Sequence, residues 1–301
     1  MIRSIVSTAV AGLAGYAATK AVLRSRLRTQ RDVVRTNHAG REVSLIEGPA
    51  VTAGLLAGGL LIEDPRQRAA TLLATAAAGG LGAVDDFCES GSSKGLRGHL
   101  SALARGEITT GALKITGIPL AAIAAATILR SGAPRPGARG LADSLGSALG
   151  TGLGARKNDR AWYAAAADIV VTGGVIAGSA NLFNLLDLRP GRALKTGALT
   201  LALTDHERRV SWSPSAAIAG ATAAAWPEDL AGEVMLGDTG ANALGAAIGV
   251  ILAETASPGR RRLVLAVLAG LTLASEKVSF TSVIESTPGL REIDAFGREG
   301  V

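Results

Sequence analysis

The stretch M-L-G-D-T-G-A-N-A-L-G-A-A-I-G-V-I-L-A-E, residues 235–254, joins a short polar motif to a long apolar run. From Ala243 to Ala253 every residue is Ala, Leu, Ile, Val or Gly. A helix that crosses a bilayer needs about 20 mostly apolar residues, and about 17 is the lower limit. We therefore interpret residues 238–254 as a membrane-spanning helix that begins with Asp238.

Comparable apolar runs recur along the whole chain. The 301 residues are 48% hydrophobic but only 3% aromatic, and 39 of them are glycine. Small residues let helices in a membrane approach one another closely, so that packing holds them together. We predict an all-α fold, a polytopic transmembrane helical bundle of about nine spans. The predicted spans cover residues 4–23, 45–62, 69–84, 111–129, 162–180, 194–204, 213–226, 238–254 and 261–275.

Basic residues suggest how these spans are oriented. Arginines crowd the loop between the first two spans, from Arg24 to Arg41. Because cytoplasmic loops are rich in Lys and Arg, we predict that the N-terminus lies outside and the C-terminus is cytoplasmic. The basic segment 130–161 falls outside by this count, and we interpret it as a loop or a peripheral helix. We divide the chain into a transmembrane domain, 1–275, and a cytoplasmic C-terminal loop or tail, 276–301.

Composition also excludes several classes of protein. The net charge is +6, but the charges lie between apolar runs, which favours cytoplasmic loops and anionic lipid over nucleic acid as their partner. The only cysteine, Cys88, cannot form an internal disulfide, and no Cys/His cluster indicates zinc. The predicted location is the plasma membrane, which the chain would cross several times.

The first candidate site is G-A-V-D-D-F-C-E, residues 82–89, at the end of the third span. The neighbouring carboxylates of Asp85 and Asp86 repel each other unless a cation or a proton is shared between them. Mg²⁺ prefers oxygen ligands and typically takes one or two carboxylates plus substrate phosphates. The alternative is that both acids only cap the span in solvent.

Two further motifs lie in predicted cytoplasmic segments. The loop K-G-L-R-G-H places Lys94, Arg97 and His99 where they can bind phosphate oxygens, although ordinary loop charge is the alternative. Residues 181–195 begin N-L-F-N-L-L-D, so that polar side chains recur every third position at a helix end. Such groups are costly to bury unless they bind something, and a capped helix terminus is the alternative. The candidate residues of this third motif are Asn181, Asn184 and Asp187.

The fourth motif opens the span at residues 238–254. A helix N-terminus has free backbone donors that attract phosphate, so Asp238 and Thr239 lie at a position suited to a phosphate ligand. Asp238 can instead simply cap its helix.

Together the four segments resemble the polyprenyl-phosphate N-acetylhexosamine-1-phosphate transferase family, which includes the phospho-MurNAc-pentapeptide transferase and the GlcNAc-1-phosphate transferases. The shared order is D-D, K-G-L, N-x-x-N-L-x-D and G-D-x-G-x-x-x-L-G, from Asn37 to Gly245. The resemblance implies a helical membrane fold, Mg²⁺, a UDP-amino-sugar donor and a polyprenyl-phosphate acceptor. It also implies a role in cell-envelope biosynthesis, with the active site facing the cytoplasm.

The positions that match the family's motifs are Asp85, Asp86, Lys94, Asn184, Asp187 and Asp238, and the neighbouring polar residues Arg97, His99 and Asn181 are added from their own chemistry. Asp86 and Asp238 would be the metal ligands. The candidate catalytic residues are Asp85, Asp86, Asp187 and Asp238, and the candidate substrate-binding residues are Lys94, Arg97, His99, Asn181 and Asn184.

Two departures from the family pattern keep alternatives open. Pro190 stands where the pattern D-G-x-D-G has its second aspartate, and residues 276–294 lack the histidines of the family's last cytoplasmic loop. One alternative is a catalytically silent relative that binds nucleotide-sugar or lipid carrier and regulates envelope synthesis. Another is a membrane transporter, since acids within membranes often line ion paths. Whether the chain forms a homodimer is left open.

Overall fold

The computed structural model describes residues 2–36, 40, 42–88, 109–131, 153–204 and 212–298. These residues are mostly helical, which confirms the expected helical fold. They also form one small antiparallel sheet, in which β1 (Val34–Thr36) pairs with β2 (Glu42–Ser44). This hairpin lies in the arginine-rich segment that we predicted to be a loop.

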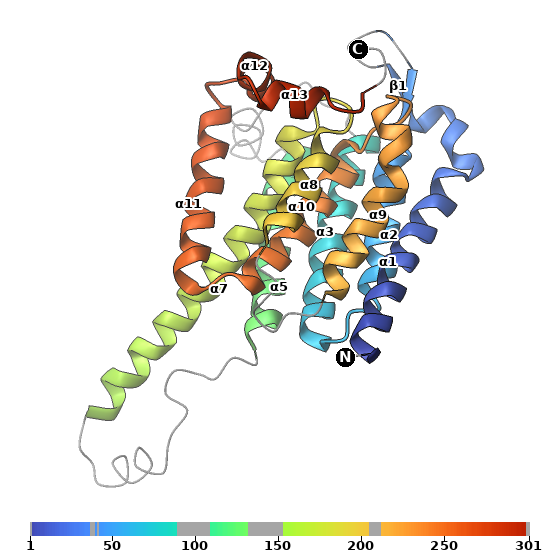
Figure 1. Ribbon diagram of the computed structural model, residues 1–301. Coiled ribbons are helices and arrows are strands. Elements are labelled where there is room, and N and C mark those ends of the chain that lie inside the picture. The colour runs from blue at the N-terminus through green and yellow to red at the C-terminus, as the bar shows by residue number, and fades with distance from the viewer. Residues whose placement is uncertain are drawn as a thin grey trace.

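The long helices follow the predicted apolar runs, and Figure 1 shows them side by side in one bundle. α12 (Phe280–Ser286) and α13 (Leu290–Ala295) lie across one end of this bundle, opposite to the end at which α1 begins. The long helices are α1 (Ile2–Leu23), α2 (Glu47–Gly59), α3 (Pro65–Cys88), α5 (Thr110–Arg130), α7 (Leu153–Leu186), α8 (Arg192–Leu203), α9 (Ser213–Leu230), α10 (Gly237–Thr255) and α11 (Pro258–Ser275).

Within the described residues, three helical segments are long and apolar enough to cross a membrane. They are Ser4–Thr29, Thr110–Arg130 and Ala161–Leu186. A fourth is possible if α11 and α12, which meet at a bend of 98°, are counted as one broken span. The structure therefore contains membrane-type helices, whereas the number of about nine spans and their orientation stay predictions.

The basic segment 130–161 is partly helical. α7 already begins at Leu153, so residues 153–161 are its first turns and not a loop. The run 141–152 lies outside the described residues.

α10 forms the centre of the bundle. It is apolar around its whole circumference, as expected for a helix enclosed by other helices, and most of its residues are fully buried. Leu244 and Ile248 belong to one hydrophobic cluster, and Ala246 and Val250 belong to a second cluster on another side of the helix. α10 therefore joins the two halves of the core.

Two glycines bring neighbouring helices against the N-terminus of α10. A Cβ atom on Gly82 of α3 would clash with the carbonyl oxygen of Asp238, and one on Gly48 of α2 would clash with that of Leu236. Only glycine allows this backbone contact, which places the end of α3 directly beside the start of α10.

This packing predicts opposite effects for two neighbouring glycines of α3. Gly82→Ala should destabilise the protein by about 1–3 kcal/mol because the added methyl group overpacks a backbone contact. Gly80→Ala should leave stability unchanged or raise it by up to about 1 kcal/mol, because nothing lies near its Cβ position and alanine favours helix. Thermal unfolding in detergent micelles measures both, and equal midpoints would contradict the close approach of α3 to α10.

Candidate functional site

Asp86, in the last turn of α3, caps the N-terminus of α10. Its Oδ1 accepts a hydrogen bond from the backbone N–H of Asp238 at 3.0 Å. Its Oδ2 accepts bonds from the backbone N–H of Thr239 at 2.8 Å and from the Thr239 hydroxyl at 2.6 Å. The first N–H groups of a helix have no partner within the helix, so Asp86 satisfies donors that would otherwise be unpaired. A carboxylate has about four acceptor positions, and Asp86 uses three of them here.

Lys114 of α5 bridges two further acids at this end of the bundle, Asp85 and Asp238. Its Nζ lies 2.7 Å from Oδ2 of Asp85, and the same Nζ forms a salt bridge with Asp238. The three side chains are largely buried, with exposed fractions of 16% for Lys114, 14% for Asp85 and 26% for Asp238. One ammonium group therefore holds two carboxylates that would repel each other without it.

Asp187 lies one residue beyond the end of α7, close to the same helix end. Burial raises the pKa of Asp187 well above its usual range, and the negative charge of Asp229 raises it further, while the backbone of Gly237 has the opposite effect. Oδ2 of Asp229 accepts a hydrogen bond from the backbone N–H of Gly191 at 3.0 Å. The turn after α7 therefore contains one carboxyl group, that of Asp187, and is bonded to a second, that of Asp229 in α9.

Glu47, the first residue of α2, is fully buried. Neither of its carboxylate oxygens has a hydrogen-bond partner in the described part of the chain. The charges of Asp229 and Asp187 act on it repulsively. A buried carboxylate without a partner is costly, so this position is suited to a cation or to a hydrogen-bond donor from a ligand.

We call the carboxyl groups at this end of the bundle the acidic group. The structure brings the four predicted catalytic residues into it and adds two that are not among the predicted site residues. Its members are Asp85, Asp86, Asp187, Asp238, Glu47 and Asp229.

The predicted substrate-binding residues are distributed differently. Asn184 lies one helical turn before Asp187, and its backbone oxygen accepts a hydrogen bond from the Asp187 N–H at 3.3 Å. Asn181 donates from Nδ2 to the Thr272 hydroxyl of α11 at 3.0 Å, so it contacts a neighbouring helix and not the acidic group. Lys94, Arg97 and His99 lie outside the described residues.

The C-terminal segment is tied to the turn that follows Asp187. Arg192 forms a bidentate pair with Asp294 of α13, Nε to Oδ1 at 2.7 Å and Nη2 to Oδ2 at 3.1 Å. Burial raises the pKa of Asp294, but the hydrogen bond and charge of Arg192 and the charge of Arg298 outweigh it and hold the pKa below its usual range. α13 is therefore anchored by a buried ion pair to the turn that follows α7.

The acidic group can be tested for a fit to Mg²⁺. No three acidic, histidine or cysteine side chains of the described residues gather closely enough to hold a metal ion by themselves. Asp85 and Asp238 nevertheless share one cation, the ammonium of Lys114, and Asp86 beside them retains one acceptor position. Because Mg²⁺ commonly uses one or two carboxylates and completes its shell with phosphates and water, the residues fit a site shared with substrate.

No protein-family model and no curated protein sequence matches the chain. The geometry of the acidic group and its chemistry therefore carry the functional argument.

The double contact of Lys114 predicts a stability effect that depends on divalent cations. Lys114→Met should destabilise the protein by on the order of 3 kcal/mol, because two largely buried carboxylates lose their shared cation. Mg²⁺ should raise the unfolding temperature of this variant more than that of the unaltered chain.

The matched control is Lys20→Met, which removes a lysine paired with Glu228 alone, at 3.1 Å. It leaves one carboxylate without its cation and not two, so it should destabilise the protein less than Lys114→Met and show no added response to Mg²⁺. Identical Mg²⁺ responses of the two variants, measured by thermal unfolding in detergent, would contradict a cation position between Asp85 and Asp238.

Proposed function

We propose that this chain is a membrane-embedded transferase that moves an amino-sugar 1-phosphate, or a MurNAc-pentapeptide phosphate, from a UDP-sugar to polyprenyl phosphate. The products are a lipid-diphospho-sugar and UMP. The observation that carries the proposal is the joining of Asp85, Asp86 and Asp238 at the start of α10, through Lys114 and the α10 backbone. The order of the sequence motifs supports the same reaction.

The reaction brings two anions together. An oxygen of the lipid phosphate attacks the β-phosphorus of the UDP-sugar, and a new P–O bond forms. The bond between the β-phosphorus and the bridging oxygen breaks, and UMP leaves with the electron pair. Positioning and neutralisation of charge are the main requirements of such a phosphoryl transfer.

Four residues of the acidic group, together with Lys114 and Asn184, have proposed roles in this chemistry. Asp238 and Asp86 would hold Mg²⁺, and Asp86 in addition fixes the backbone of Asp238 through the α10 cap. When bound, Mg²⁺ would neutralise charge on the diphosphate oxygens. Lys114 would pass from the carboxylates to phosphate oxygens, while Asp85 orients the lipid phosphate. Asn184 and Asp187 would position the nucleotide.

Contacts of the arginine-rich segment support a cytoplasmic position for the site. Arg28 forms a salt bridge with Glu233 at 2.5 Å, and Arg35 donates to the backbone oxygen of Asp86 at 3.2 Å. The segment that the positive-inside rule assigns to the cytoplasm therefore lies at the same end of the bundle as the acidic group. We propose a multi-pass protein of the plasma membrane with about nine spans and its active site on the inner face.

The proposed function is tested by reconstitution. The purified chain in vesicles with polyprenyl phosphate and radiolabelled UDP-GlcNAc or UDP-MurNAc-pentapeptide should form labelled lipid and UMP in equal amounts. A chelator of divalent cations should abolish the reaction, and Mg²⁺ should restore it. Saturable binding of UDP-sugar without product would indicate the catalytically silent relative, and absence of both would refute the proposal.

Asp238→Asn should lower turnover by about 100-fold or more, as the loss of one charge-stabilising group does in other active sites. The control is Asp32→Asn, which changes an exposed carboxylate in the segment between the first two long helices and should leave turnover unchanged. Full turnover of the Asp238→Asn variant would remove Asp238 from the metal site.

A further inference from the structure

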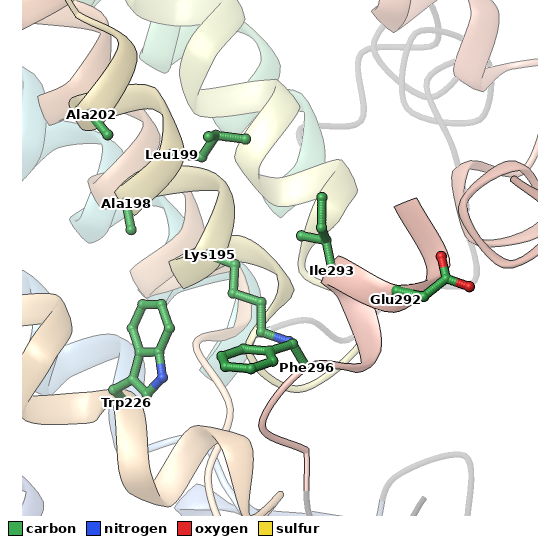
Figure 2. Close-up of a pocket in the computed structure, with 8 residues that line it drawn as sticks. All are labelled: Lys195, Ala198, Leu199, Ala202, Trp226, Glu292, Ile293 and Phe296. Carbon is green, nitrogen blue, oxygen red and sulfur yellow. The ribbon is translucent and has the colours of Figure 1, made fainter. Parts of the chain in front are cut away.

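An apolar groove of about 600 Å³ lies between α8, α9 and α13 (Figure 2). Ala198, Leu199 and Ala202 of α8 form one wall, and Trp226 of α9 and Phe296 beyond α13 line it from other sides. We call it the α8 groove. It is separate from the acidic group, because none of the six acidic residues lines it.

The groove exposes large apolar side chains. Phe296 is 76% exposed and Leu199 is 53% exposed. Contiguous apolar surface of this kind usually marks a site at which another molecule binds. α8 has only 12 residues, about 18 Å of helix, so it is too short to cover the apolar layer of a bilayer alone.

Positive charge is concentrated at one end of the groove. Lys195 lines this end and donates from Nζ to the backbone oxygen of Asp294 at 2.6 Å. Arg192 and Arg298 both pair with the carboxylate of Asp294, and the charge of Asp229 also acts on Lys195, so three cations lie near two acids. The other acid at the groove, Glu292, is already paired with Arg291 at 2.7 Å.

We propose that the α8 groove binds a glycerophospholipid with an anionic headgroup. An acyl chain lies along Ala198, Leu199 and Ala202, and the phosphate lies at Lys195. The apolar wall matches the chain, and the excess of cations matches the headgroup, as in other basic sites beside membrane helices. This proposal depends on the chain residing in a membrane but not on the transferase reaction.

A second copy of the chain fits this surface less well. A symmetric dimer brings the same surface of two subunits together, so the excess of cations around Asp294 would be present twice in one interface. Like charges placed opposite one another disfavour such an interface. An anionic lipid instead supplies the charge that this end of the groove lacks.

Trp226 provides a direct reporter of the occupant. The chain has three tryptophans, so Trp162→Phe with Trp212→Phe leaves Trp226 as the only one. The double variant is reconstituted into vesicles of unbrominated phosphatidylcholine. Increasing mole fractions of a lipid with brominated acyl chains are added, either brominated phosphatidylglycerol or brominated phosphatidylcholine. Bromine quenches the fluorescence of a tryptophan in contact with it. Quenching by brominated phosphatidylglycerol should be half complete at a several-fold lower mole fraction than quenching by brominated phosphatidylcholine.

Two further substitutions separate the headgroup from the chain. Lys195→Gln should make the two half-quenching fractions equal, and Ala202→Phe should reduce quenching by both lipids because it fills the groove. Leu120→Phe, on an exposed position of α5, is the control and should change neither.

Three results would overturn the proposal. Equal half-quenching fractions in the double variant would exclude recognition of the headgroup. Recovery of fluorescence by polyprenyl phosphate at a lower mole fraction than by unbrominated phosphatidylglycerol would assign the groove to polyprenyl phosphate. Quenching that falls as the protein-to-lipid ratio rises would show that a second copy covers the groove.

Discussion

The cap that Asp86 places on the N-terminus of α10 is the interaction on which the rest of the site depends. A buried helix end needs partners for its first N–H groups, and Asp86 supplies them for Asp238 and Thr239. Gly82 of α3 allows the approach that makes the cap possible. Because Asp238 belongs to the capped turn, the same contact that stabilises the central helix also fixes an acid beside Asp85 and Lys114.

The acidic group carries more negative charge than its partners among the described residues neutralise. Lys114 neutralises part of the charge of Asp85 and Asp238, but Glu47 has no hydrogen-bond partner within the described residues and is repelled by Asp229 and Asp187. A fold selected only for stability would replace such a carboxylate with an apolar residue. Such a locally unfavourable buried charge is typical of functional sites, in which a bound ligand neutralises it.

The sequence predicted those features that local pattern determines. Apolar runs located the long helices, and acids at the ends of runs located Asp85, Asp86 and Asp238. Lys114 was not predicted, because it is a single cation inside an apolar run with no acid near it in sequence. The pairing of Arg192 with Asp294 joins residues 102 positions apart, and neither residue carries a local sign of it. Such contacts are set by the packing of helices, which periodicity does not reveal.

The turn at Pro190 and Gly191 joins the acidic group to the C-terminal segment. Gly191 adopts a left-handed conformation, with φ of 76°, and its N–H donates to Asp229 of α9. A carboxyl group from α9 therefore lies at this turn. The next residue, Arg192, carries the ion pair to Asp294 and so fixes the C-terminal segment. One short turn thus connects the acidic group, through Gly191 and Asp229, with the segment that Arg192 anchors beside the α8 groove.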